Sequence, residues 1–289
     1  MKDKVVVLGA KGMTGRIVFR FLKNYFPNSI FGTTRNKSEI KKNLFLFRAQ
    51  FTKKDFEIIQ KKLKKIDFVI NCIGIVEQNA PTSKLIHINS LFPHILLELS
   101  KKHNFKIIHV SSDAVFSSLA GKVDEISPAS ADSNYGISKL LGELRVPNAL
   151  NIRTSIIGLD PIKHKGILEW AKRAKQKKLR GFTNQIWTGC TTCQFATLCK
   201  YIIQNNRFSE LSKQSNIYHF APVGPVTKFR IIKEFLQLIR SSKVVEKSHG
   251  KKISRALSSY YLDSSTLNKY TRSLPQALKE LLDFEKELI

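Results

Sequence analysis

The residue types that could transfer a proton lie close together in the middle of the chain. Segment 106–110, which reads as a strand, leads into Ser112 and Asp113, and Tyr135 and Lys139 follow. Residues four apart on a helix share a face, so Tyr135 and Lys139 can act on one bound group. The lysine charge is expected to lower the pKa of the tyrosine, and the Ser112 hydroxyl to bind the same substrate oxygen. We predict that Ser112, Tyr135 and Lys139 are catalytic residues for chemistry at a carbonyl. Ser112, Asp113 and Tyr135 are also the predicted substrate-binding residues.

A glycine-rich turn precedes these residues near the N-terminus. Its spacing is Gly-x-x-Gly-x-x-Gly at Gly9, Gly12 and Gly15, between an apolar run and a helical pattern. The first glycine permits a tight turn, the second lets the backbone approach a pyrophosphate, and the third lets the helix pack closely on the strand. Phosphates would then lie at the positive end of a helix. The turn predicts a dinucleotide cofactor.

The end of the second expected strand bears on which dinucleotide binds. It reads Thr33, Thr34, Arg35, Asn36, without the carboxylate that would bind the ribose 2′-hydroxyl of NAD. Arg35 can instead pair with a 2′-phosphate, and Lys11 in the glycine turn can reach the same phosphate. The sequence therefore predicts NADPH, with NADH as the alternative.

Alternating strands and helices are expected to position these residues. Strands are expected at 4–8, 29–34, 43–47, 67–70, 106–110 and from 149, and helices at 13–25, 55–63, 85–103 and 135–145. Near-continuous apolar strands that alternate with helices indicate a parallel sheet covered on both faces. The predicted fold class is α/β: a Rossmann-type, doubly wound parallel sheet with a smaller C-terminal substrate-binding lobe. The predicted domains are 1–158 for the cofactor and 159–289 for the substrate, with segments of the second returning to the first.

The second half of the chain has a looser pattern. Helices are expected at 164–179, 191–204, 226–239 and 274–287, and short strands at 216–220 and 259–262. The segment 164–180 is rich in lysine and arginine and carries a single acid, Glu169.

Composition excludes several classes of protein. The 289 residues are 42% hydrophobic, which excludes a wholly disordered chain, and no apolar run approaches the roughly 20 residues that span a bilayer. Four cysteines are too few for a disulfide framework in a chain of this length and predict a cytoplasmic location. Cys190 and Cys193 have the spacing of metal ligands but no second pair, so no metal site is expected.

The net charge of +27 has two interpretations. It could serve a polyanionic partner such as nucleic acid or a membrane surface, or an anionic small substrate with the other lysines as a solvated coat. The lysines run through the whole chain and form no single block, which favours the second interpretation. We therefore expect no specific nucleic-acid partner. The sequence leaves a homodimer open.

The ordered set of motifs resembles the extended short-chain dehydrogenase/reductase superfamily. Within it, the chain is similar to the dTDP-4-dehydrorhamnose reductase family of nucleotide-sugar 4-ketoreductases. The resemblance rests on the glycine turn, Asn71-Cys72-Ile73-Gly74, Asn89, Ser111-Ser112-Asp113-Ala114-Val115-Phe116, Tyr135-x-x-x-Lys139 and Arg153-Thr154-Ser155. It covers residues 4 to 158 and thins to Asn184-Gln185 and Thr191-Thr192 beyond them.

The resemblance implies NADPH-dependent reduction of a keto group on a nucleotide-activated deoxysugar, a step in making surface polysaccharide precursors. The nucleotide sugar is the implied partner, and Asn89 is expected to support Lys139. Together with the glycine turn and the second strand, the resemblance implies that the cofactor is bound by Gly9, Lys11, Gly12, Met13, Thr14, Gly15, Thr34, Arg35, Asn71, Cys72, Ile73, Gly74, Tyr135 and Lys139.

Residue 114 separates the branches of this superfamily. Dehydratases usually carry Thr-Asp-Glu at this strand end, and Ala114 cannot replace that glutamate. Epimerases usually carry Ser-Ser-Ser or Ser-Ala-Ser, which Asp113 does not match. The reductase pattern Ser-Thr-Asp-x-Val-Phe fits better, although Ser112 replaces its threonine, Ala114 a usual tyrosine, and Ser117-Ser118 a usual Asp-Gly, so the sugar stays open. The alternatives are an epimerase or dehydratase of the same superfamily, a non-catalytic NADP-binding regulatory protein, or a nucleic-acid-binding protein. The intact Ser112, Tyr135 and Lys139 argue against a non-catalytic protein.

Overall fold

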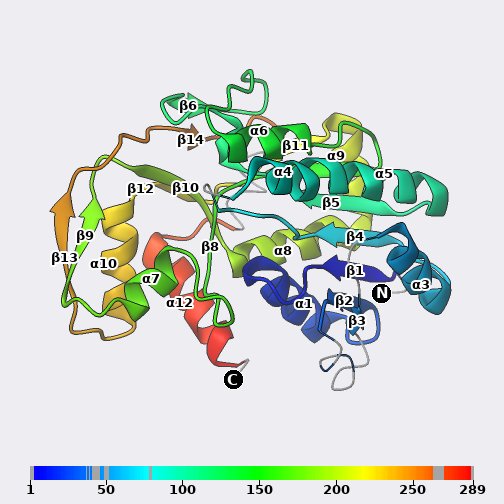
Figure 1. The fold of residues 1–289 in the computed structure, drawn as a ribbon, viewed down its shortest axis with the longest axis horizontal. Coiled ribbons are helices and arrows are strands. Elements are labelled where there is room, and N and C mark those ends of the chain that lie inside the picture. Colours follow the sequence, from blue (N-terminus) through cyan, green and yellow to red (C-terminus); the bar gives the residue numbers. More distant parts are fainter. Residues whose placement is uncertain are drawn as a thin grey trace.

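A seven-stranded parallel sheet forms the centre of the molecule in the computed structural model, which describes residues 3–36, 38, 40, 46–48, 52–77, 80–262 and 270–287 (Figure 1). Its strand order is β3-β2-β1-β4-β5-β7-β11, and every pairing in it is parallel. The strands are β1 (Val5–Leu8), β2 (Ile30–Thr34), β3 (Leu46–Arg48), β4 (Phe68–Asn71), β5 (Lys106–Val110), β7 (Ala149–Arg153) and β11 (Ile217–His219). The predicted doubly wound Rossmann-type sheet is confirmed. Of the third expected strand, residues 43–45 lie outside the described part of the chain.

Helices cover both faces of this sheet, which explains why its strands are apolar at nearly every position. In β1, Val5 and Val7 pack in one core with α1 (Met13–Tyr25) and α8 (Thr192–Ile203). Val6 and Leu8 belong to a second core with α3 (Lys53–Leu63) and α5 (Phe92–His103). Successive side chains of a strand point to opposite faces, so a strand buried on both faces has no polar alternation.

The expected helix at 85–103 contains a change of helical type. A short α4 (Thr82–Leu85) runs into a π-helical turn (Ile86–Leu91), which runs into α5. Asn89 lies in this turn and is fully buried. Such π-turns are frequent at functional sites because they redirect side chains locally.

The second half of the chain takes part in three small sheets, two of which include a strand of the first half, and it returns to the central sheet. Their orders are β12-β10-β8, β13-β9 and β14-β6, while β11 extends the central sheet and α8 packs on α1. The strands are β6 (Lys122–Val123), β8 (Ile156–Ile157), β9 (Lys178–Phe182), β10 (Ile186–Thr191), β12 (Val223–Thr227), β13 (Val244–Ser248) and β14 (Ala256–Leu257). The helices are α6 (Asn134–Leu141), α7 (Ile167–Arg173), α9 (Arg207–Gln214), α10 (Lys228–Leu238) and α12 (Leu274–Lys286).

Two sequence expectations for this half are wrong. The helix expected at 164–179 ends at Arg173, and Lys178 begins β9, where Leu179 and Gly181 alternate inward against α10. The strand expected at 259–262 is absent, and the nearby strand is β14. At the first of these places a short strand is buried on one face, and the helical spacing of the neighbouring lysines obscures it.

The fold also gathers basic residues that the sequence separates. Segments 162–182 and 228–252 hold sixteen lysines and arginines and three acids, about half of the net charge of +27. The two segments pack together through the β9–β13 pairing and the contacts of α10 with α7 and β9 (Figure 1). The fold thus brings these two basic segments together, although about half of the net charge lies in the rest of the chain.

Within the described ranges, no helix is long and apolar enough to cross a membrane, and no three His, Cys, Asp or Glu side chains are placed to hold a metal ion. All four cysteines are free thiols, and Cys190 and Cys193 are buried.

Candidate active site

The glycine turn is shaped to bring backbone close to a ligand at the start of α1. Gly9 has φ +75° and its N–H donates to Thr33 Oγ1 at 3.1 Å, which ties the turn to β2. A Cβ on Gly15 would lie 2.2 Å from the Gly9 carbonyl oxygen, so only glycine lets the helix approach this closely. Gly12 caps α1 without a side-chain hydrogen bond, which leaves the first amides of the helix to bind an anion. The turn fits a dinucleotide pyrophosphate.

Several of the predicted cofactor residues lie at or near the carboxyl ends of the parallel strands. Thr34 ends β2, buried, and accepts a hydrogen bond from Asn36 N–H, while Arg35 is exposed. Asn71 ends β4, and Gly74 follows it in the loop beside α6, where an added Cβ would lie 4.0 Å from Lys139 Nζ. Because the carboxyl ends of parallel strands share an edge, the glycine turn, Arg35 and Lys139 lie along the same side of the sheet.

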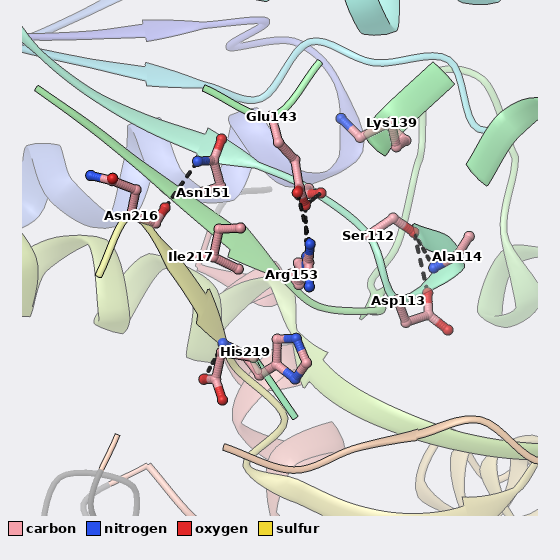
Figure 2. Close-up of polar contacts among 12 residues, drawn as sticks. Ser112, Asp113, Ala114, Lys139, Glu143, Asn151, Arg153, Asn216, Ile217 and His219 are labelled. Atoms are coloured by element: carbon pink, nitrogen blue, oxygen red, sulfur yellow. Dashed lines mark hydrogen bonds and ion pairs between the residues drawn. The ribbon is translucent and has the colours of Figure 1, made fainter. Parts of the chain in front are cut away.

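Ser112 and Asp113 follow β5 at this edge (Figure 2). Ser112 Oγ accepts a hydrogen bond from Ala114 N–H at 3.1 Å and donates to Asp113 Oδ1 at 3.2 Å. The residues after Ser112 form a 3₁₀ turn, Asp113–Val115, that buries the Ala114 side chain.

Tyr135 and Lys139 lie on α6, as their spacing predicts. Ser133 caps this helix by accepting from Gly136 N–H at 3.1 Å. A Cβ on Gly136 would lie 2.1 Å from the Ala114 carbonyl oxygen, so this glycine lets α6 press against the 3₁₀ turn. The Ser112 side chain lies close enough to Tyr135 to lower the pKa of the phenol, and the structure thus brings Ser112 to the residues of α6.

Burial dominates the acid–base properties of the pair on α6. It raises the pKa of Tyr135 to about 12, against a smaller lowering effect of the nearby Ser112 side chain. Burial also lowers the pKa of Lys139 to about 8, against the charge of Glu143. Lys139 Nζ donates to the Val110 carbonyl at 2.7 Å. The expectation that Lys139 lowers the tyrosine pKa is therefore wrong in this structure, because burial of the phenol raises its pKa and Lys139 is not among the groups that shift it.

Asn89 connects the loop after β4 to the catalytic helix. Its Oδ1 accepts from Ile75 N–H at 2.9 Å, and its Nδ2 donates to the Ile75 carbonyl at 2.9 Å and to Ser138 Oγ at 3.0 Å. Both N–H groups of the Asn89 amide therefore donate hydrogen bonds, and its oxygen accepts one. Asn89 acts on Lys139 indirectly, by fixing the loop and the helix between which the lysine lies.

A buried ion pair between Arg153 and Glu143 lies next to Ser111, which follows β5 (Figure 2). Arg153 donates to both carboxylate oxygens of Glu143, at 2.7 and 2.8 Å, and Ser111 Oγ donates to the same carboxylate at 2.8 Å. Both side chains of the pair are almost fully buried, so each charge depends on its partner. Glu143 lies four residues after Lys139 and favours its charged form.

Two basic residues of the C-terminal half that the sequence analysis missed lie at this site. Arg255 forms an ion pair with Asp113 at 2.7 Å. Lys228, the first residue of α10, is half-buried, and burial is the main cause of its lowered pKa. The charge of Asp113 raises that pKa, and the charge of Arg255 lowers it. Asn184 and Gln185, part of the resemblance, hold the chain that leads to Arg255: their amides donate to the carbonyls of Gly250 and Lys251 at 2.6 and 2.9 Å.

Taken together, the parallel sheet, the glycine turn and the Ser–Tyr–Lys set define a protein of the short-chain dehydrogenase/reductase type. The model of the NAD dependent epimerase/dehydratase family matches residues 5–186. The chain belongs to that family and is an NAD(P)-dependent oxidoreductase.

Solved structures share the fold over almost the whole chain. The dTDP-4-dehydrorhamnose reductase of Clostridium acetobutylicum is similar with a TM-score of 0.76 and 20% identity, over 98% of this chain and 99% of that chain. The same enzyme from Bacillus anthracis, in complex with NADP, has a TM-score of 0.76 and 16% identity over 98% and 99%. The dTDP-glucose 4,6-dehydratase of Bacillus anthracis, in complex with NAD, has a TM-score of 0.73 and 16% identity over 99% and 97%. No curated protein sequence matches the chain. At these low identities the structural similarity shows the fold alone, and the reaction has to be argued from the site.

Proposed function

We propose that this protein reduces a keto group on a nucleotide-activated deoxysugar with NADPH, as the dTDP-4-dehydrorhamnose reductases do. When bound, the nicotinamide supplies the hydride. Tyr135 donates its proton to the keto oxygen, and a pKa of about 12 keeps that proton on the phenol at neutral pH. Ser112 orients the same oxygen. Lys139 holds the nicotinamide ribose and places a positive charge beside the phenol.

The observation that carries this proposal is the nature of residue 114. Ala114 is buried in the 3₁₀ turn against α6 and has no group that can gain or lose a proton. Dehydration of a sugar needs a further acid–base pair at this strand end, whereas reduction needs only the proton of Tyr135. Ser112, Tyr135 and Lys139 supply the groups that the proposed reduction needs.

The choice of NADPH rests on the end of β2. Thr34 is buried and Arg35 is exposed there, and β2 contributes no carboxylate to this edge. An exposed guanidinium matches a 2′-phosphate better than a 2′-hydroxyl.

Residues 159–289 are proposed to supply the substrate-binding lobe. Lys228 and Arg255 come from this half and lie beside Asp113, so they are placed to meet an anionic substrate. A nucleotide diphosphate carries the matching charge. The free state of all four cysteines is consistent with the proposed cytoplasmic location.

A second candidate function is epimerisation or dehydration of a nucleotide sugar, because the family contains both reactions in its name. The stoichiometry of the cofactor separates the candidates. Purified protein is mixed with a dTDP-4-keto-6-deoxy sugar and NADPH or NADH, and the loss of absorbance at the reduced nicotinamide band is compared with sugar products seen by NMR. Reduction consumes one NADPH for each sugar converted. Conversion without net loss of NADPH would contradict the proposal and indicate an epimerase or dehydratase.

A further inference from the structure

Arg255 reaches the active site from the far end of the sequence and is held there by the backbone on both sides. Its Nε donates to Asp113 Oδ2 at 2.7 Å and its Nη1 to the Phe116 carbonyl at 3.4 Å. The flanking amides of Ser254 and Ala256 donate to the carbonyls of Ser118 and Gly121, at 2.8 and 2.7 Å. Both side chains of the ion pair are largely buried, at 15% and 19% exposed. The β14–β6 pairing holds the backbone next to Arg255 in place, and the two hydrogen bonds of the guanidinium orient the side chain.

Asp113 competes with the reacting groups for a single proton. The Ser112 hydroxyl has one hydrogen, which it donates to Asp113 Oδ1 at 3.2 Å, while its oxygen accepts from Ala114 N–H. A carboxylate only accepts hydrogen bonds, so this direction is fixed. While Ser112 donates to Asp113, it cannot donate to the Tyr135 oxygen or to a substrate carbonyl.

We propose that Arg255 is a positioning residue, which neutralises Asp113 and so releases the Ser112 proton to the reacting oxygen beside Tyr135. The inference rests on the proposed function of Ser112 and Tyr135. With Arg255 on the other carboxylate oxygen, Asp113 is a weaker acceptor, and the hydroxyl can turn at little cost. Without Arg255, a bare and largely buried carboxylate would hold the hydroxyl proton tightly.

Both members of the Asp113–Arg255 pair also affect the pKa of Tyr135. Asp113 raises the pKa of Tyr135 and Arg255 lowers it, beneath the larger effect of burial. The other charged groups nearby are Lys139 on α6 and Lys228 at the start of α10. The charges of Asp113 and Arg255 both affect the pKa of Lys228. Asp132, whose pKa is lowered mainly by hydrogen bonds from Ser118, also feels Arg255. Removing either member of the Asp113–Arg255 pair therefore changes the acidity of the phenol, with opposite signs.

A titration of the phenol tests this without any turnover. Position 135 is replaced by 3,5-difluorotyrosine, whose more acidic ring titrates in a range where the protein stays folded, and its midpoint is followed by ¹⁹F NMR. Arg255→Met is expected to raise the midpoint by about one pH unit and Asp113→Asn to lower it by a similar amount. The double variant is expected to return close to the parent. Arg173→Met is the matched control, since it removes an arginine from the carboxylate of Glu169, away from the site.

The opposite shifts show that both charges act on the phenol, and the Ser112→Ala background shows whether Arg255 acts through the Ser112 proton. If Arg255→Met lowers turnover by the same factor with and without the Ser112 hydroxyl, Arg255 does not act through Ser112, and that result would overturn the proposal. Arg255→Lys keeps the charge and is expected to restore the parent midpoint. If Arg255→Met does not fold, Arg255→Gln and Asp113→Asn still give the two opposite shifts.

Turnover gives the second measurement. Arg255→Met is expected to lower kcat by about threefold to tenfold through weaker proton donation, and Arg255→Lys to recover most of it. A chain that reduces no nucleotide sugar, yet shows the opposite shifts, would contradict the proposed function and leave the role of Arg255 intact. A chain that reduces its sugar normally, with no shift, would overturn only the role of Arg255.

Discussion

At the scale of single residues, burial sets the chemistry more than sequence spacing does. Tyr135 and Lys139 lie on one face of α6, yet the pKa of Tyr135 is raised to about 12 and that of Lys139 is lowered to about 8, in both cases chiefly by desolvation. The spacing reveals which residues meet but not how deeply they are buried. The tyrosine therefore remains a proton donor across the neutral range, and Lys139 is the group that titrates there.

Lys139 should limit activity on the alkaline side. Since the proposed role needs the ammonium, kcat/KM is expected to fall as the pH rises through about 8, where Lys139 loses its proton. Glu143 raises that pKa, so Glu143→Gln is expected to move the fall to lower pH. The pH profile of kcat/KM measures both. A profile flat to pH 10 would show that the lysine charge is not required.

Arg35 should decide the cofactor. Calorimetry is expected to show tighter binding of NADPH than of NADH, because a guanidinium can pair with the 2′-phosphate. Arg35→Asp is expected to reverse that order, since a carboxylate accepts from the 2′-hydroxyl and repels the phosphate. Equal affinities for the two cofactors in the parent would refute the argument from β2.

At the scale of elements, the central sheet could be predicted and the C-terminal half only in part. The strands β1, β4 and β5 are buried on both faces, so their apolar runs are unambiguous. β9 pairs with β13 and buries only alternate residues, and the lysines in and before β9 have a helical spacing. Arg255 could not be found, because its meeting with Asp113 depends on the β14–β6 pairing between segments far apart in the sequence. Local pattern carries no information about such a contact.

The approach of α6 to the strand end depends on Gly136. In Gly136→Ala, the new Cβ would lie 2.1 Å from the Ala114 carbonyl oxygen, so α6 must move away and carry Tyr135 with it. We expect a loss of about 1–3 kcal/mol in the free energy of unfolding and a large loss of turnover. Gly224→Ala is the control, because no atom lies within 4 Å of its added Cβ. Denaturant unfolding of both variants gives the comparison, and equal stabilities would contradict the close approach of α6.

At the scale of the whole molecule, the concentration of charge in one part of the C-terminal half predicts weak binding of polyanions. Non-specific DNA is expected to bind with a dissociation constant of roughly 10⁻⁴ to 10⁻⁶ M at physiological salt, and more weakly as salt rises. Replacing Lys175, Lys177 and Lys247 by glutamate should weaken this binding more than the same change at Lys54, Lys61 and Lys101. All six are exposed. Fluorescence anisotropy measures both sets, and nanomolar, sequence-selective binding would instead favour a nucleic-acid-binding protein.

The most direct test of the central claim is the turnover of Tyr135→Phe with NADPH and a nucleotide keto-sugar. The change removes the acid and leaves the ring packed, so turnover is expected to fall by about 10²- to 10⁴-fold while NADPH affinity barely changes. Lys139→Met is the informative companion, because it should weaken both turnover and NADPH binding. A Tyr135→Phe protein that reduces the keto-sugar at the parent rate would contradict the account.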